Sequence, residues 1–237
     1  MQQIILTIPA YEPAPCLPEL VKGVLPHVKG CLIVDDGSCR ADGVFDELRG
    51  LAGVTVLRHS QNRGKGAALK TAFAEIIRRF PTALGTVTAD ADGQHMPADI
   101  LRVAESLAAH PEQLSLGVRD FGTGVPFRSR LGNLWTIAEF RLLTGRTVRD
   151  TQTGLRGIPL SLLPRLLEIP GNRYDYEIRM LVQAAVHFGD IVQLPISTVY
   201  DEGNRTSHFR PFVDTLKTQG ALFAAALTAR CGWRSRA

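Results

Sequence analysis

The stretch "LGTVTADADGQHMPADI", residues 84–100, contains the elements of one strand, one polar turn and the start of one helix. Its first part, residues 84–90, is mostly apolar until its last position, as expected for a strand buried on both faces of a parallel sheet. Pro97 suits the first turn of a helix, where its missing N–H has no partner to lose. This strand–turn–helix unit predicts an α/β fold.

The same alternation extends over the first 120 residues. Four more short apolar segments are predicted strands, at residues 4–8, 31–35, 54–57 and 114–118. Between the strands lie helical patterns, and the clearest follows Gly66. It places on one helix face Leu69, Ala72, Phe73, Ile76, Ile77 and Phe80. The pattern predicts a single doubly wound, mostly parallel sheet.

The pattern changes after residue 120. Helices are predicted at residues 131–145, 174–188 and 211–230, and strands near residues 151–158 and 190–200. We expect Trp135 and Phe140 of the first of these helices to lie in the core. No repeat and no Pro-, Gly- or Ser-rich linker divides the chain. One domain is therefore predicted, residues 1–237, with parts at 1–120, 121–210 and a C-terminal helix and basic tail at 211–237.

Composition excludes several classes of protein. Apolar residues at 45% and charged residues at 21% exclude a disordered chain, and aromatic residues at 7% without a basic stripe exclude a nucleic-acid binder. The four cysteines form no zinc pattern, no export signal is seen and no apolar run reaches the length of a membrane span, so we expect a cytoplasmic protein. From Gly203 onward, six Lys or Arg residues face one acid. This surplus indicates an anionic partner such as phosphate or a lipid surface, or simply a soluble basic tail.

Two carboxylates end the predicted strand at residues 84–90. Asp90 and Asp92 are two positions apart, so on a strand they would share a face and repel each other. A divalent cation between them is the simplest remedy, since hard cations prefer carboxylate oxygens. The alternative is a solvated turn.

Three other polar motifs follow predicted strands: "IPAYEP" at residues 8–13, "VDDGS" at 34–38 and "HSQNRGKGAALK" at 59–70. Because the carboxyl ends of parallel strands meet at one edge, these motifs predict a pocket there. "NRGKG" lacks both the full phosphate-loop pattern and the dinucleotide fingerprint. "VDDGS" suits a turn, or a carboxylate that accepts a hydrogen bond from a nucleobase.

In this order and spacing, the four motifs resemble the family 2 inverting glycosyltransferases of the GT-A fold. The likeness is closest to the dolichyl- and polyprenyl-phosphate sugar synthases, whose metal motif commonly reads Asp-x-Asp-x-Gln-His. It is strong over residues 1–120 and looser to about residue 210. It implies that Asp90, Asp92 and Gln94 bind Mg²⁺ or Mn²⁺ on the diphosphate of a GDP- or UDP-hexose. His95 would be a further metal ligand or a hydrogen-bond donor beside the metal. The resemblance also assigns a catalytic role to Asp92.

The resemblance also assigns donor contacts to residues 1–120, the nucleotide-sugar-binding half. Base and ribose would be lined by Pro9, Tyr11 and Glu12. Asp36, with Asp35 beside it, would contact the base, and Asn62 and Lys65 would help to close the pocket. The chain departs from the common Pro-x-Tyr-Asn-Glu pattern, because Glu and Pro follow its tyrosine.

The acceptor half, residues 121–210, is rich in arginine. Between residues 119 and 156 there are seven arginines against three acids, and arginine forks match phosphate oxygens. The resemblance assigns to a lipid phosphate the residues Arg119, Arg128, Arg130, Arg205 and Ser207. It also places below the sugar Asp150, Gln152 and Thr153. The alternatives are an ordinary basic surface and a turn stabilised by Asp and Thr side chains.

Asp175 and Glu177 lie at the start of a predicted helix, where acids are favoured by the helix dipole. In relatives with hydroxyl acceptors a carboxylate here is the general base, whereas an ionised phosphate acceptor needs none and the acid would position sugar hydroxyls. We therefore expect metal-dependent transfer of a hexose to a polyprenyl phosphate. The alternatives are a hydroxyl acceptor or a non-catalytic nucleotide-sugar-binding module. A lipid acceptor implies peripheral contact with the inner face of the membrane, or a membrane partner.

Overall fold

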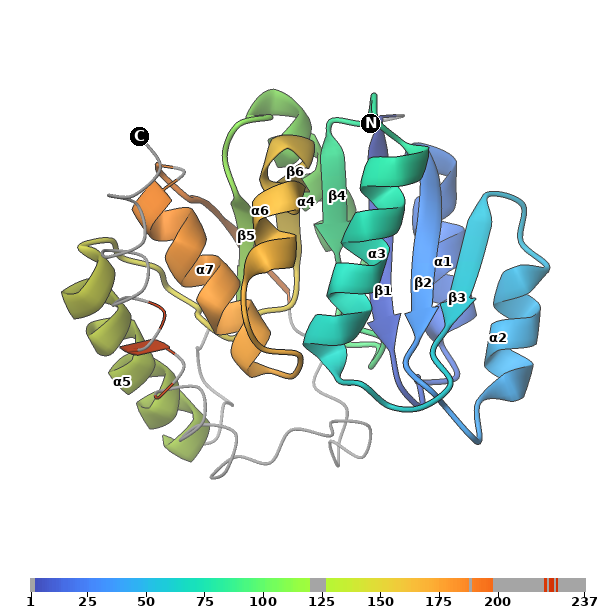
Figure 1. Ribbon diagram of the computed structural model, residues 1–237, viewed down its shortest axis with the longest axis horizontal. Coiled ribbons are helices and arrows are strands. Elements are labelled where there is room, and N and C mark those ends of the chain that lie inside the picture. The colour runs from blue at the N-terminus through green and yellow to red at the C-terminus, as the bar shows by residue number, and fades with distance from the viewer. Residues whose placement is uncertain are drawn as a thin grey trace.

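The computed structural model describes residues 3–119, 127–187 and 189–197 and residues 220, 222, 223 and 225, with only the backbone described for 127–133. Its strands form one sheet in the order β3-β2-β1-β4-β6-β5-β7 (Figure 1). They are β1 Ile4–Ala10, β2 Gly30–Asp35, β3 Val54–Arg58, β4 Gly85–Thr88, β5 Ser115–Arg119, β6 Arg156–Pro159 and β7 Val192–Ile196. Strands from both halves of the chain thus belong to the same sheet.

The sheet is parallel except at β6. β1 pairs in parallel with β2 and β4, β2 with β3, and β5 with β7, whereas β6 runs antiparallel to both β4 and β5. The strands are short and almost wholly buried near the centre, because helices cover both faces of a parallel sheet. The predicted mostly parallel α/β sheet is confirmed.

Helices cover both faces (Figure 1). On one face lie α1 Leu17–Val24, α2 Asp42–Arg49 and α4 Pro97–Ala109, and on the other lie α3 Lys65–Arg79, α6 Leu163–Glu168 and α7 Asp175–His187. α5 Phe127–Thr144 lies beyond α7, and short 3₁₀ turns occupy Leu25–His27 and Leu160–Leu162. Each helix layer packs its own cluster of apolar side chains against the sheet.

The buried face of α5 differs in part from the expected one. Phe140 is fully buried, as predicted, but Trp135 is 65% exposed, so its assignment to the core was wrong. The helix turns Thr136 and Phe140 inward and leaves Trp135 on its outer side. In the predicted helix at residues 211–230, the structure describes four residues. All four are helical, and Leu222 and Ala225 among them are buried.

The strand that leads to Asp90 is shorter than predicted. β4 ends at Thr88, and the Ala89 N–H donates to the Thr7 carbonyl as the chain leaves the sheet. Asp90 and Asp92 therefore lie in the loop before α4, and their alternation on a strand was wrong. The loop is fixed by a bond from the Ala14 N–H to the Ala91 carbonyl (3.0 Å). Within the described residues, no helix has the length and apolar character needed to cross a membrane.

Candidate active site

The loops that follow β1, β2 and β3 are bonded to one another at the carboxyl edge of the sheet. The Glu12 N–H donates to Ser38 Oγ (2.9 Å), and the Glu12 carboxylate accepts from the N–H groups of Cys39 (2.8 Å) and Arg40 (3.2 Å). Glu12 has a positive φ of 47°, an uncommon conformation outside glycine. In the described structure, the glutamate that departs from the family pattern thus bonds to the loop after β2. Pro9 is buried in β1, and Tyr11 is partly exposed beside these loops.

The two acids after β2 are buried and bonded within the protein. Asp35 accepts from the Ser38 N–H (2.8 Å) and lies 3.2 Å from Arg58 Nε. Asp36 accepts from the N–H groups of Arg63 (2.9 Å) and Gly64 (2.7 Å). Its Oδ1 also lies 2.6 Å from Nδ1 of His59. These bonds fix the turn at Gly64 that precedes α3. Contact of Asp35 or Asp36 with the nucleobase of the donor stays a prediction. Asn62 is exposed in the same turn.

Asp90 lies at the centre of the charged groups. Its Oδ1 is 2.6 Å from Lys65 Nζ, and its Oδ2 is 3.5 Å from His95 Nε2. Lys65 also contacts Glu177 Oε2 (2.7 Å), so one ammonium joins acids from the two halves of the chain. Burial acts to raise the pKa of Asp90, but Lys65 and His95 outweigh it and hold the pKa below its ordinary value. Burial likewise acts to lower the pKa of Lys65, and Asp90 and Glu177 raise it above its ordinary value. Lys65 is therefore a cation at neutral pH.

Asp92 is the less well compensated acid of the pair. It accepts from the Gln94 N–H (3.0 Å), while burial and the nearby Asp90 raise its pKa. His95 Nε2 is buried without a hydrogen-bond partner in the described part of the chain. The surroundings of Asp92 thus favour an added cation.

The donor set fits a hard divalent cation held jointly with a ligand. No cluster of three or more His, Cys, Asp or Glu side chains suited to a metal occurs within the described ranges. Asp90, Asp92 and the Gln94 amide offer oxygen donors, and Mg²⁺ typically binds through one or two carboxylates plus substrate phosphates. Lys65 supplies a positive charge to Asp90 in the structure. The residues present therefore fit the expected Mg²⁺ or Mn²⁺.

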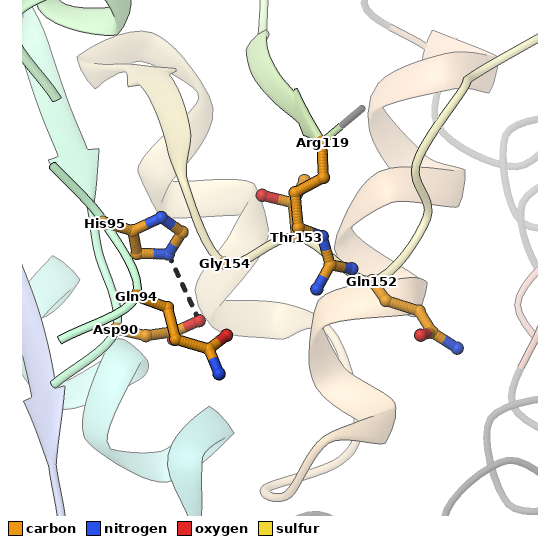
Figure 2. A pocket seen from close by; sticks show the side chains of 7 residues that line it. All are labelled: Asp90, Gln94, His95, Arg119, Gln152, Thr153 and Gly154. Atoms are coloured by element: carbon orange, nitrogen blue, oxygen red, sulfur yellow. Dashed lines mark ion pairs between the residues drawn. The ribbon is translucent and has the colours of Figure 1, made fainter. Parts of the chain in front are cut away.

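A cavity lies between the Asp90 loop, the end of β5 and the segment before β6 (Figure 2). It is lined by Asp90, Gln94, His95, Arg119, Gln152, Thr153 and Gly154. Gln152, Thr153 and Gly154 belong to the segment before β6, whereas Arg119 ends β5. β6 runs antiparallel to β4, so it begins at the edge of the sheet where β4 ends. The segment before β6 therefore lies next to the Asp90 loop, about sixty residues earlier in the chain, and both line one cavity.

Gly154 lies directly against the Asp90 carboxylate. A Cβ at this position would be 2.4 Å from Asp90 Oδ2 and 2.5 Å from Oδ1, so any side chain displaces the acid. We predict that Gly154→Ala lowers turnover by about a hundredfold, the effect of a displacement near 1 Å in an active site. Steady-state kinetics measure the loss, and thermal unfolding checks that the fold persists. Gly43→Ala is the matched control, because nothing lies within 4 Å of a Cβ there. Equal kinetics for both variants would contradict this role of Gly154.

Arg119 and Asp150 are bound to each other. Nε of the guanidinium donates to Asp150 Oδ2 (2.6 Å) and Nη2 to Oδ1 (3.1 Å), and Asp150 is fully buried. Asp150 also accepts from the Gln152 N–H (2.9 Å). Asp150 thus braces Arg119 and the Gln152 backbone, and its contact with the sugar stays a prediction. Gln152 and Thr153 line the cavity. The side chains of Arg128 and Arg130, and all of Arg205 and Ser207, lie outside the described residues.

The structure separates the two acids at the start of α7. Asp175 accepts from the Arg173 N–H (3.2 Å) and lies 3.5 Å from Arg179 Nε, so it stabilises the helix start. Glu177 is 8% exposed and contacts Lys65. Glu177, not Asp175, thus joins the charged cluster of Asp90.

Arg156 is not among the site residues expected from the sequence. It is fully buried, and it donates from Nε to the Thr153 carbonyl (3.0 Å) and from Nη1 to the Glu177 carbonyl (2.7 Å). These bonds link the cavity segment to α7. The available signal was an arginine at the start of an otherwise apolar strand.

The chain resembles solved structures of one enzyme in its fold. Glucosyl-3-phosphoglycerate synthase from Mycobacterium tuberculosis, in complex with phosphoglyceric acid, superposes with a TM-score of 0.70 at 19% identity, over 98% of this chain and 80% of that chain. The same enzyme with Mn²⁺, UDP-glucose and glycerol 3-phosphate gives 0.69 at 19% identity, with the same coverage. These likenesses show that the chain has the GT-A fold.

The chain belongs to glycosyl transferase family 2, whose model matches residues 6–163. UDP-N-acetylglucosamine–dolichyl-phosphate N-acetylglucosaminyltransferase from Methanococcus voltae is 30% identical over 225 residues, with 84% of this chain and 86% of the relative covered. Polyprenol monophosphomannose synthase from Mycolicibacterium smegmatis is 28% identical over 208 residues, with coverage of 83% and 77%. The predicted family, and its likeness to polyprenyl-phosphate sugar synthases, are confirmed.

Proposed function

We propose that this glycosyltransferase moves a hexose, with inversion, from a nucleotide sugar to a polyprenyl phosphate. The observation that carries the proposal is the charged cluster of Asp90, Lys65 and Glu177, which joins the Asp90 loop to the acceptor half. Two relatives named for lipid-phosphate acceptors support the choice of acceptor. The donor would be a GDP- or UDP-hexose, and the site of action the inner surface of a membrane.

The chain would bind the donor diphosphate at the edge that holds Asp90. Asp90, Asp92 and Gln94 would hold Mg²⁺ or Mn²⁺, which offsets the negative charge that develops on a departing nucleoside diphosphate. Lys65 opens α3, so its ammonium and the helix N-terminus both favour an anion nearby. Asp36 supports this by fixing the backbone at Gly64.

Glu177 would orient the sugar and need not remove a proton. A phosphate acceptor is already ionised at neutral pH, so its oxygen attacks without a general base. Glu177 Oε2 lies 2.7 Å from Lys65 Nζ, and a carboxylate has further acceptor positions for a hydrogen bond from a sugar hydroxyl. The position of Glu177 also suits a second candidate function, in which it acts as base toward a hydroxyl acceptor.

Glu177→Gln distinguishes the two acceptor types. With a phosphate acceptor we predict a loss of turnover within about tenfold, because the amide oxygen can still accept the Lys65 hydrogen bond. With a hydroxyl acceptor that needs the base, the loss would be about a hundredfold to ten-thousandfold. Turnover with short polyprenyl phosphate measures the difference, and Glu105→Gln, at an exposed position of α4, is the control.

The function itself is tested by transfer from defined donors. Purified protein is incubated with UDP-N-acetylglucosamine, UDP-glucose or GDP-mannose, with Mn²⁺ or EDTA, and with or without short polyprenyl phosphate. Metal-dependent release of nucleoside diphosphate that rises with the lipid would support the proposal and identify the sugar. Release that ignores the lipid would favour a hydroxyl acceptor. Donor binding without turnover under any of these conditions would favour the non-catalytic module.

A further inference from the structure

The outer side of α5 carries exposed apolar side chains in helical register. Leu134 is 54% exposed, Trp135 65% and Leu142 80%, and Ala138 and Arg141 are exposed between them. Their spacing of i, i+1, i+4, i+7 and i+8 places them on one face of the helix, here called the α5 stripe. In most helices of soluble proteins, only the buried face is apolar. A second apolar face that is exposed therefore indicates a partner that covers it.

The α5 stripe points away from the core. The opposite face of the helix contributes Thr136 and Phe140, both buried, and α5 packs on α7. In Figure 1, α5 lies at the end of the molecule, beyond α7. The stripe is therefore not required to complete the described core.

The chemistry of α5 matches an anionic lipid surface. Tryptophan has an apolar ring and a polar N–H, and it concentrates at the boundary between acyl chains and headgroups. The helix sequence contains three arginines, at positions 128, 130 and 141, against one acid, Glu139. Positive charge beside apolar side chains is the pattern of helices that lie in a membrane interface.

The place of α5 in the fold connects it to the site. The helix follows β5, whose last residue, Arg119, lines the cavity, and it packs on α7, which carries Glu177. We infer that the α5 stripe docks on an anionic lipid bilayer and brings the cavity to the membrane surface. The inference rests on the proposed lipid-phosphate acceptor, which resides in such a bilayer.

Vesicle flotation tests the docking. Wild-type protein is mixed with vesicles of phosphatidylcholine and phosphatidylglycerol at about 7:3, or of phosphatidylcholine alone. We expect binding to the anionic vesicles, and binding weakened about tenfold or more in the Trp135→Ser/Leu142→Ser variant. Arg141→Glu should weaken it also, whereas Arg49→Glu, on α2 at the other end of the molecule, should not. In a Trp233→Phe background, the emission of Trp135 should shift to shorter wavelength when anionic vesicles are added.

Activity without a bilayer keeps this inference separate from the proposed function. With short polyprenyl phosphate in detergent, the Trp135→Ser/Leu142→Ser variant should turn over like wild type. Absence of transfer by wild type in detergent would count against the proposed function alone. Equal flotation of the variant and wild type would overturn the docking. A dimer in analytical ultracentrifugation that the variant abolishes, without flotation of wild type, would overturn it in favour of a second copy.

Discussion

Asp92→Ala is expected to lower sugar transfer by about a thousandfold, equivalent to ~4 kcal/mol in the activation free energy. Asp90 already has Lys65 and His95 close by, whereas the pKa of Asp92 is raised by burial and by Asp90 itself. Asp92 is thus the carboxylate whose charge most lacks compensation. Removing it relieves repulsion between the two acids, so the fold should persist while the set proposed to bind the cation loses one of its two acids.

Two measurements are needed to assign the loss to cation binding. Turnover is compared with and without Mn²⁺, and Mn²⁺ affinity is measured by calorimetry in the absence of a donor. Asp92→Asn should behave like Asp92→Ala in both, because an amide keeps the shape and loses the charge. Asp46→Asn, which alters only an exposed ion pair with Arg49, should match wild type. Turnover of Asp92→Ala within tenfold of wild type, still sensitive to EDTA, would show that the metal binds elsewhere.

The fold was predictable because its signals are local. Short apolar strands that alternate with amphipathic helices define a parallel sheet, and each predicted strand of residues 1–120 is observed. The errors occurred where packing between distant segments decides. β4 ends at Thr88, opposite the first residue of β6, although β1 continues to Ala10. The outward turn of Trp135 depends on which face of α5 packs on α7. Strand direction at β6 has no signature in its sequence of four residues.

The residues of the candidate site were easier to predict from the sequence than the contacts between them. Asp90, Gln94, Arg119 and Gln152 were named from sequence, and all four line the cavity. Which acid of α7 would join them could not be known, because Asp175 and Glu177 are equally suited to a helix start. Lys65 decides between them, and it lies more than one hundred residues earlier in the chain. A charge pair of this sequence separation leaves no local pattern.

Arg156 gives the largest expected effect on stability. Its guanidinium is fully buried at the start of β6, where it donates to the Thr153 and Glu177 carbonyls. Burial lowers the pKa of Arg156, and attraction to Glu177, Asp150 and Asp90 opposes that shift. The arginine therefore compensates the negative charge of three nearby acids and also links two segments of the chain through its hydrogen bonds.

Arg156→Met should reduce the free energy of unfolding by about 3–5 kcal/mol, the range seen when one member of a buried charge set is removed. Methionine nearly fills the volume, so the loss reports the two lost hydrogen bonds and the uncompensated acids more than a cavity. Urea unfolding measures it, and Arg78→Met, which alters an exposed pair with Glu75, should cost at most about 0.5 kcal/mol.

Arg156→Lys separates the charge from the geometry. Lysine restores a cation but cannot donate in two directions from a planar fork, so we expect a smaller loss of about 1–3 kcal/mol. Turnover of the folded Lys variant should still fall, because the Thr153 segment and the start of α7 are no longer held together across the cavity. If Arg156→Met unfolds within 1 kcal/mol of wild type, the acids are compensated without this arginine and its two bonds carry little of the stability.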